Sequence, residues 1–65
     1  MQISVNGEVE QIEPQSLENY LFNKSLLGRR IAVERNGDIV PKSQFSDVIL
    51  KDGDVLEIVH AIGGG

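Results

Sequence analysis

Three consecutive glycines, Gly63, Gly64 and Gly65, follow Ile62 at the end of the sequence, directly after an apolar run. Glycine loses more conformational freedom on folding than any other residue and has no side chain to pack. We therefore expect residues 63–65 to form a flexible tail that projects beyond the domain. A chain without β-carbons can thread a narrow channel in a partner, so this tail would present the carboxylate of Gly65 to a partner enzyme.

The chemistry open to the carboxylate of Gly65 is acyl transfer. A carboxylate is a poor acyl donor at neutral pH, but an enzyme can activate it with ATP as an acyl-adenylate. A sulfur nucleophile can then attack the adenylate and leave a thiocarboxylate. We predict that Gly65 is the site of this covalent modification and that Gly63 and Gly64 extend its reach. The alternative is a frayed end without chemistry, which the direct junction with an apolar strand disfavours.

The other candidate residues give a weaker case for chemistry. His60 is the single histidine, and the sequence offers it neither a nucleophile nor an orienting partner. Asp52 and Asp54 flank Gly53, but calcium needs several more oxygen ligands, so this segment is predicted to be a turn. Without cysteine the chain has no thiolate nucleophile and no sulfur-built zinc site. We predict a protein that is not an enzyme, with no catalytic residue, metal site or bound cofactor.

Length, composition and charge place the chain in a narrow class. Its 65 residues allow one small domain, and 40% hydrophobic with 25% charged residues is typical of a globular protein. A formal net charge of −4 argues against nucleic-acid binding, which needs a basic surface to neutralise phosphates. No apolar stretch approaches the roughly 20 residues of a membrane span, and no secretory signal is evident. We expect a cytoplasmic protein without nucleic-acid or membrane partners.

The N-terminal residues are predicted to form a hairpin. Gln2–Val5 alternates apolar and polar side chains, as a half-buried strand does. Asn6 and Gly7 accept the positive φ angles of a tight turn. Residues 8–12 would return as a second strand, whose weaker alternation indicates either a bulge or an early end.

A helix is predicted after the hairpin. Leu17, Tyr20 and Leu21 have the spacing of one helical face, and Ser16 before them is a good N-cap. Gly28 is the predicted stop signal. Because so short a helix is marginal in water by itself, it must pack on a sheet.

The C-terminal half is predicted to contain strands over residues 31–35, 38–40, 48–50 and 55–62, with turns at 36–37 and 52–54. A hairpin, one helix and further strands indicate an α+β fold, with the helix on one face of a mixed sheet of four to five strands. We assign residues 1–62 to this single domain and residues 63–65 to the tail.

The last strand offers a candidate docking surface. Leu56 and Ile58 share a parity and are predicted to face the core, which leaves Val59 and Ala61 on the opposite face. An exposed apolar patch beside a mobile tail would suit a partner, although other elements of the fold might equally cover both faces. The predicted docking residues are Val59, His60, Ala61 and Ile62.

Several of these segments resemble known proteins. The opening residues 1–5 are similar to the first strand of ubiquitin, and the order of elements resembles the ubiquitin-like β-grasp fold. The Gly-Gly ending and residues 33–36, 39–41, 52–54 and 57–60 look like the ThiS family of thiamine sulfur carriers. The resemblance covers nearly the whole chain, whereas residues 16–30 add little to it.

The resemblance implies a pathway for the tail. A ubiquitin-activator-like adenylyltransferase would use ATP to adenylylate Gly65. Sulfur derived from cysteine through a desulfurase would then convert Gly65 to a thiocarboxylate, which thiazole synthase would use to build the thiazole of thiamine. Three alternatives remain open at this point: the small subunit of molybdopterin synthase, a carrier for tRNA thiolation or ubiquitin-like modifier, and a β-grasp interaction module without covalent chemistry.

Overall fold

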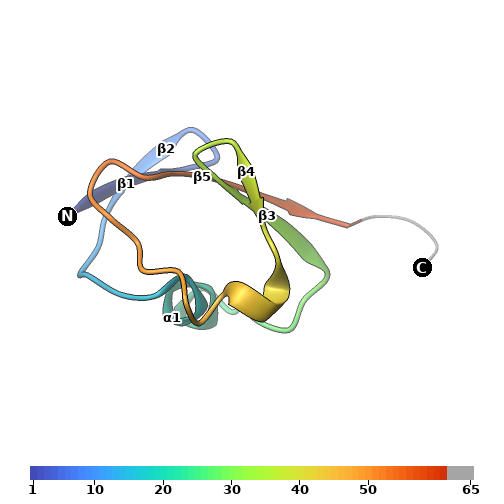
Figure 1. Ribbon diagram of the computed structural model, residues 1–65. Helices are drawn as coiled ribbons and strands as arrows, with labels where there is room; N and C mark the ends of the chain where they lie inside the picture. Colours follow the sequence, from blue (N-terminus) through green and yellow to red (C-terminus); the bar gives the residue numbers. More distant parts are fainter. Residues whose placement is uncertain (62–65) are drawn as a thin grey trace.

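Five strands form one mixed sheet, in the order β2-β1-β5-β3-β4, in a computed structural model that describes residues 1–61 (Figure 1). The predicted α+β fold with one main helix is confirmed. The strands are β1 (Gln2–Val5), β2 (Glu8–Gln11), β3 (Ile31–Arg35), β4 (Asp38–Val40) and β5 (Val55–His60); the helices are α1 (Leu17–Asn23) and the 3-10 turn η1 (Lys42–Gln44).

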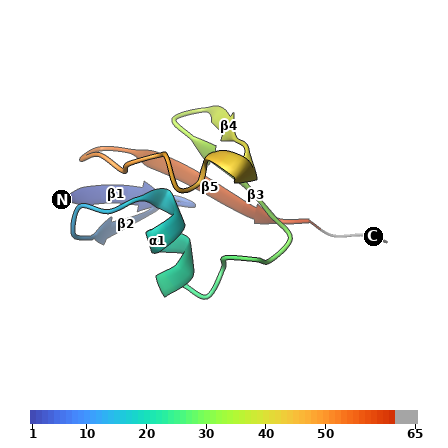
Figure 2. The same cartoon turned by 60° about the horizontal axis from the view of Figure 1, so that its bottom comes forward.

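The helix α1 and the segment that follows β4 lie against one face of the sheet (Figure 2). Between these two layers lies the core, and no helix among residues 1–61 is long and apolar enough to cross a membrane. The buried hydrophobic side chains are Ile3, Val5, Leu17, Tyr20, Leu21, Ile31, Val33, Val40, Phe45, Leu50, Leu56 and Ile58.

Both predicted Asn-Gly turns are confirmed. Asn6 and Gly7 have φ angles of 51° and 84°, and Asn36 and Gly37 have φ angles of 53° and 89°. Two successive positive φ angles give the turn whose twist matches that of the strands it joins. The two outer hairpins, β1–β2 and β3–β4, are therefore fixed locally.

Two strand ends differ from the sequence expectation. β2 stops at Gln11, which pairs with Gln2 in an unbroken register, so the weak alternation of residues 8–12 reflects an early end and not a bulge. β5 stops at His60 rather than at residue 62, and residue 62 lies outside the described part of the chain.

The strand predicted over residues 48–50 is wrong. Ile49 forms a single isolated bridge with Ser16, and η1 precedes this loop. The backbone bonds that a strand would supply come instead from the segment entering α1: Leu50 N–H donates to Gln15 O at 2.9 Å. The three apolar residues mark a segment that packs over the start of the helix.

The start of α1 is as predicted and its end is not. Ser16 caps the helix, and its hydroxyl accepts a hydrogen bond from Asn19 N–H at 3.0 Å. The helix ends well before Gly28 because Ser25 adopts a left-handed φ of 61°. Leu26 N–H then donates to Leu21 O at 2.8 Å, which closes a Schellman motif.

A polar contact ties α1 to β2. The Tyr20 hydroxyl donates to a Glu10 carboxylate oxygen at 2.9 Å, and Lys24 Nζ lies 3.2 Å from the same oxygen. Burial and then the adjacent Glu10 carboxylate raise the pKa of Tyr20. The hydroxyl therefore stays protonated and holds the helix to the edge of the sheet.

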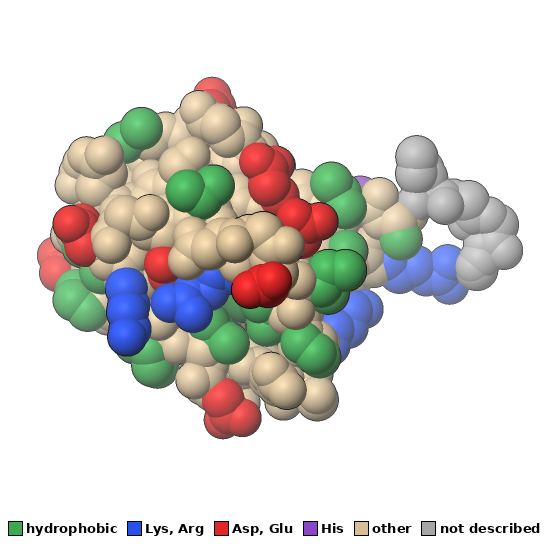
Figure 3. All heavy atoms as spheres, turned by 45° about the horizontal axis from the view of Figure 1, so that its top comes forward, with side chains coloured by type: hydrophobic (Ala, Val, Ile, Leu, Met, Phe, Trp, Pro, Cys, Tyr) green, Lys and Arg blue, Asp and Glu red, His purple; other side chains and the backbone are tan. Residues whose placement is uncertain are grey.

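The sheet face opposite α1 carries no other element among residues 1–61 (Figure 3). Four exposed hydrophobic side chains lie on it, and the strand register places Ala32 beside Val59. These hydrophobic side chains are Val9 (63% exposed), Val55 (44%), Val59 (59%) and Ile39 (71%). We call this surface the open face.

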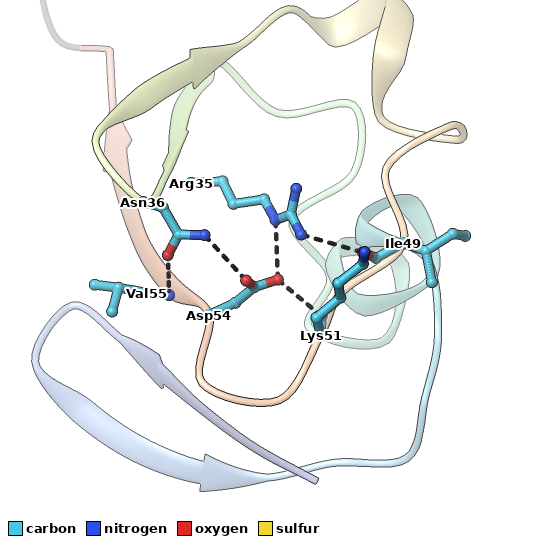
Figure 4. A network of polar contacts seen from close by, with 6 residues as sticks. All are labelled: Arg35, Asn36, Ile49, Lys51, Asp54 and Val55. Carbon is cyan, nitrogen blue, oxygen red and sulfur yellow. Dashed lines mark hydrogen bonds and ion pairs between the residues drawn. The ribbon is translucent and has the colours of Figure 1, made fainter.

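The buried carboxylate of Asp54 joins three parts of the chain at the start of β5 (Figure 4). Its oxygens accept hydrogen bonds from Arg35 Nε at 2.9 Å, from Asn36 Nδ2 at 3.0 Å and from Lys51 N–H at 2.8 Å. The amide oxygen of Asn36 also accepts from Val55 N–H at 2.9 Å. Asp54 therefore fixes the end of β3 and the turn at residues 51–54 to the first residue of β5.

Hydrogen bonding sets the charge state of Asp54. Burial by itself raises the pKa of this carboxyl group, but the Lys51 amide, Asn36 and the Arg35 guanidinium outweigh burial. The pKa of Asp54 consequently lies below its ordinary value of 3.8. Because the unfolded chain takes up the proton more readily, the stabilisation is complete above pH 3.8 and is lost as the pH falls towards the folded-state pKa.

We predict that Asp54→Asn lowers the free energy of unfolding at pH 7 by about 2 kcal/mol, because the Arg35 guanidinium and the Lys51 amide lose a charged acceptor. The variant should also lose less stability than wild type between about pH 5 and pH 2. Urea unfolding at several pH values measures both effects. Asp47→Asn, at an exposed carboxylate, is the control, and an equal pH dependence in both variants would contradict this role for Asp54.

We also predict that Ser25→Gly stabilises the fold by about 0.5–1 kcal/mol, because glycine adopts the left-handed conformation without the steric cost of a β-carbon. Thermal unfolding measures the change. Asn23→Gly places the same residue at a helical position, where it should lower the melting temperature. A loss of stability in Ser25→Gly would show that the serine side chain, and not the helix-ending conformation, matters at this position.

Candidate functional site

The candidate site is the end of β5 and the surface around it. β5 runs through the middle of the sheet, parallel to β1 and antiparallel to β3. Its end projects beyond the body of the domain, on the side away from the N-terminus (Figure 1). The pairing continues past the strand itself, because Ala61 N–H donates to Arg30 O at 2.8 Å. The chain is thus held in an extended path as far as Ala61.

An asparagine clamp strengthens this path on the other side of β5. Asn6 Nδ2 donates to Ile58 O at 3.0 Å, and Asn6 Oδ1 accepts from Ile58 N–H at 2.7 Å. Its own backbone N–H donates to Leu56 O at 2.9 Å. The side-chain amide thereby imitates one more residue of β1. The sequence predicts Asn6 only as a turn residue, since nothing local shows that its amide reaches β5.

The structure separates the predicted docking residues. Val59 and Ala61 are exposed and share the parity of the open face, whereas exposed His60 has the parity of the core face and lies opposite Ile31. Since nothing among residues 1–61 covers Val59, the exposed alternative is the one observed. The fourth predicted residue, Ile62, lies outside the described residues.

The predicted modification site cannot be placed. Gly65, together with Gly63 and Gly64, lies outside the described residues, and its role remains a prediction. The structure places only the point from which the tail starts, next to Arg30 and the open face.

Sequence reasoning missed most of the open face. Ile39 and Val55 lie on it, and the register sets Glu34 of β3 directly opposite Glu57 of β5. The alternation of Ile31–Arg35 could have shown that Glu34 faces away from the core. The pairing of Glu34 with Glu57 depends on register, which the sequence does not reveal.

Within residues 1–61 the structure shows no pocket and no group of three or more side chains suited to a metal ion. What it does present is an exposed surface and an extended strand that leads away from it. Basic side chains gather beside the projecting end of that strand (Figure 3). This arrangement is suited to contact with another protein.

Comparison with known proteins gives the family. The sequence model of the ThiS family matches residues 2–65. The sulfur carrier protein ThiS of Bacillus subtilis is 40% identical over 50 residues, which span 77% of this chain and 76% of that protein. The crystal structure of the thiamine biosynthesis protein ThiS from Geobacter metallireducens covers 100% of both chains, with a TM-score of 0.86 at 28% identity.

A further relative is a much longer protein. The thiazole synthase of Paramagnetospirillum magneticum is 44% identical over 66 residues, which cover the whole of this chain and 20% of that protein. The chain therefore spans about a fifth of the length of the first curated relatives it matches. Taken with the five-stranded sheet, the single helix and the match over residues 2–65, these similarities establish that the chain belongs to the ThiS family.

Proposed function

We propose that this chain is a sulfur carrier for thiazole formation in thiamine biosynthesis. The match of the ThiS family over residues 2–65 carries the proposal, because the matched range includes Gly63, Gly64 and Gly65. In this role Gly65 is a substrate group and the chain is not itself an enzyme. Among the alternatives, the names of the relatives favour the thiamine pathway over a molybdopterin synthase subunit.

The proposed reaction takes place in partner enzymes. An adenylyltransferase would join the carboxylate of Gly65 to AMP from ATP, with release of pyrophosphate. A sulfur donor supplied by a cysteine desulfurase would displace AMP and leave the thiocarboxylate. The carrier binds no cofactor in this scheme and uses ATP only through its partner. The extended path of β5 to Ala61 supports it, since the tail starts from a fixed point at the edge of the domain.

Thiazole synthase is the proposed acceptor of the sulfur. In the protein of that name from Paramagnetospirillum magneticum, a segment similar to this whole chain belongs to the same polypeptide. Two activities joined in one chain commonly act in sequence, which supports direct contact between carrier and synthase. We place this contact in the cytoplasm, where the sequence analysis predicts the protein to be.

We predict a mass increase equal to the difference between sulfur and oxygen when the protein is incubated with its host's activating enzyme, ATP and a sulfur source. Intact mass spectrometry measures it, and the same measurement on protein purified from the host tests whether the chain ends at Gly65. An unchanged mass, under conditions where Bacillus subtilis ThiS is converted, would favour a non-covalent interaction module.

We further predict that deleting Gly65, or adding an alanine after it, abolishes conversion without changing the melting temperature, because the reacting group is the terminal carboxylate and not part of the core. Thermal unfolding of each variant is the control for folding. Thiocarboxylate formation on both variants would refute the proposed mechanism. In the host, growth of a deletion strain restored by thiazole, and not by molybdenum cofactor, would assign the pathway.

A further inference from the structure

We infer that the open face is a docking surface for a partner enzyme that presents an arginine, and that the pair formed by Glu34 and Glu57 receives this arginine. The inference rests on the proposed function, since it names the chemistry of the surface that a sulfur-handling enzyme offers to this carrier. It starts from the register of β3 and β5, which sets the two carboxylates directly opposite each other.

The two glutamates form a like-charged pair without compensation. Both are exposed, and in antiparallel neighbours such directly opposite residues have Cβ atoms about 4.5–5.5 Å apart on the same face. The ion pairs found among residues 1–61 are Lys24–Glu10 and Arg35–Asp54, and neither involves this pair. Like charges in this position destabilise a sheet. The pair thus weakens the isolated domain and creates a local site for a cation.

Apolar side chains surround the pair. Val55 and Val59 lie two residues before and after Glu57 on the same face, Ala32 pairs with Val59, and Ile39 of β4 pairs with Glu34. Figure 3 shows acidic and hydrophobic side chains gathered side by side on this face. A partner that covers the apolar side chains would exclude water from the carboxylates, which strengthens their attraction for a cation.

Arginine fits this site better than a metal ion or a lysine. Two carboxylates supply fewer oxygens than calcium requires, and the described residues around them are apolar. A guanidinium carries five donors in one plane and can bind two neighbouring carboxylates at once, whereas an ammonium is a compact point charge. Arginine is also enriched in protein interfaces, where apolar side chains pack along its stem.

The position of the pair links docking to the tail. Glu57 precedes Gly65 by eight residues, and eight extended residues span at most about 29 Å. The arginine on the partner should therefore lie within about 29 Å of the atoms that react with the Gly65 carboxylate. This limit gives the docking surface a definite place relative to the active site of the partner.

The test compares two double variants with equal changes in charge. Glu34→Gln/Glu57→Gln neutralises the pair, and Glu13→Gln/Glu18→Gln neutralises two exposed carboxylates before and within the first turn of α1. Binding to the host's thiazole synthase and to its activating enzyme is measured by titration calorimetry at two salt concentrations. We expect the first variant to bind at least one of them roughly tenfold or more weakly than the control, with a reduced salt dependence.

Stability provides a second readout. Removal of like-charge repulsion should raise the urea midpoint of Glu34→Gln/Glu57→Gln above that of wild type, whereas a purely structural pair would lose stability on neutralisation. If wild type binds both enzymes and the two double variants bind equally well, the docking inference is overturned while the proposed function stands. If wild type binds neither enzyme, the proposed function fails and the docking inference fails with it.

Discussion

Asp54 lies where the long connection after β4 turns into β5, and its buried carboxylate binds groups from both sides of that junction. A carboxylate out of water is tolerated only where donors replace the lost hydration. Here the donors come from the end of β3 and from the turn at residues 51–54. The same contacts that satisfy the charge therefore fix the starting point of β5, and with it the register of the central strand.

The rest of the sheet follows from that register. Once Val55 is placed, Leu56 and Ile58 enter the core, and the clamp from Asn6 holds β5 against β1. A one-residue slip would turn every side chain of β5 to the other face. The slip would bury Glu57 and expose Leu56, so hydrophobic burial and the polar contacts of Asp54 favour the same arrangement.

A central strand fixed at both edges is also a suitable support for a reactive tail. The domain spends little of its small core on a binding site and leaves the open face to partners. The cost falls on the isolated domain, which exposes apolar side chains and a like-charged glutamate pair on that face. A ThiS-family protein that acts through other enzymes can accept this cost, because complex formation covers the same surface.

Local sequence patterns determined the two Asn-Gly turns, the cap at Ser16 and the buried face of α1, since each depends on contacts between residues near in sequence. They also indicated the glycine tail as the reactive part. Only the tertiary structure decided that residues 48–50 pack as a loop, that Asn6 reaches Ile58 and that Glu34 faces Glu57. These features depend on strand register and on partners distant in the chain, and no local pattern specifies either.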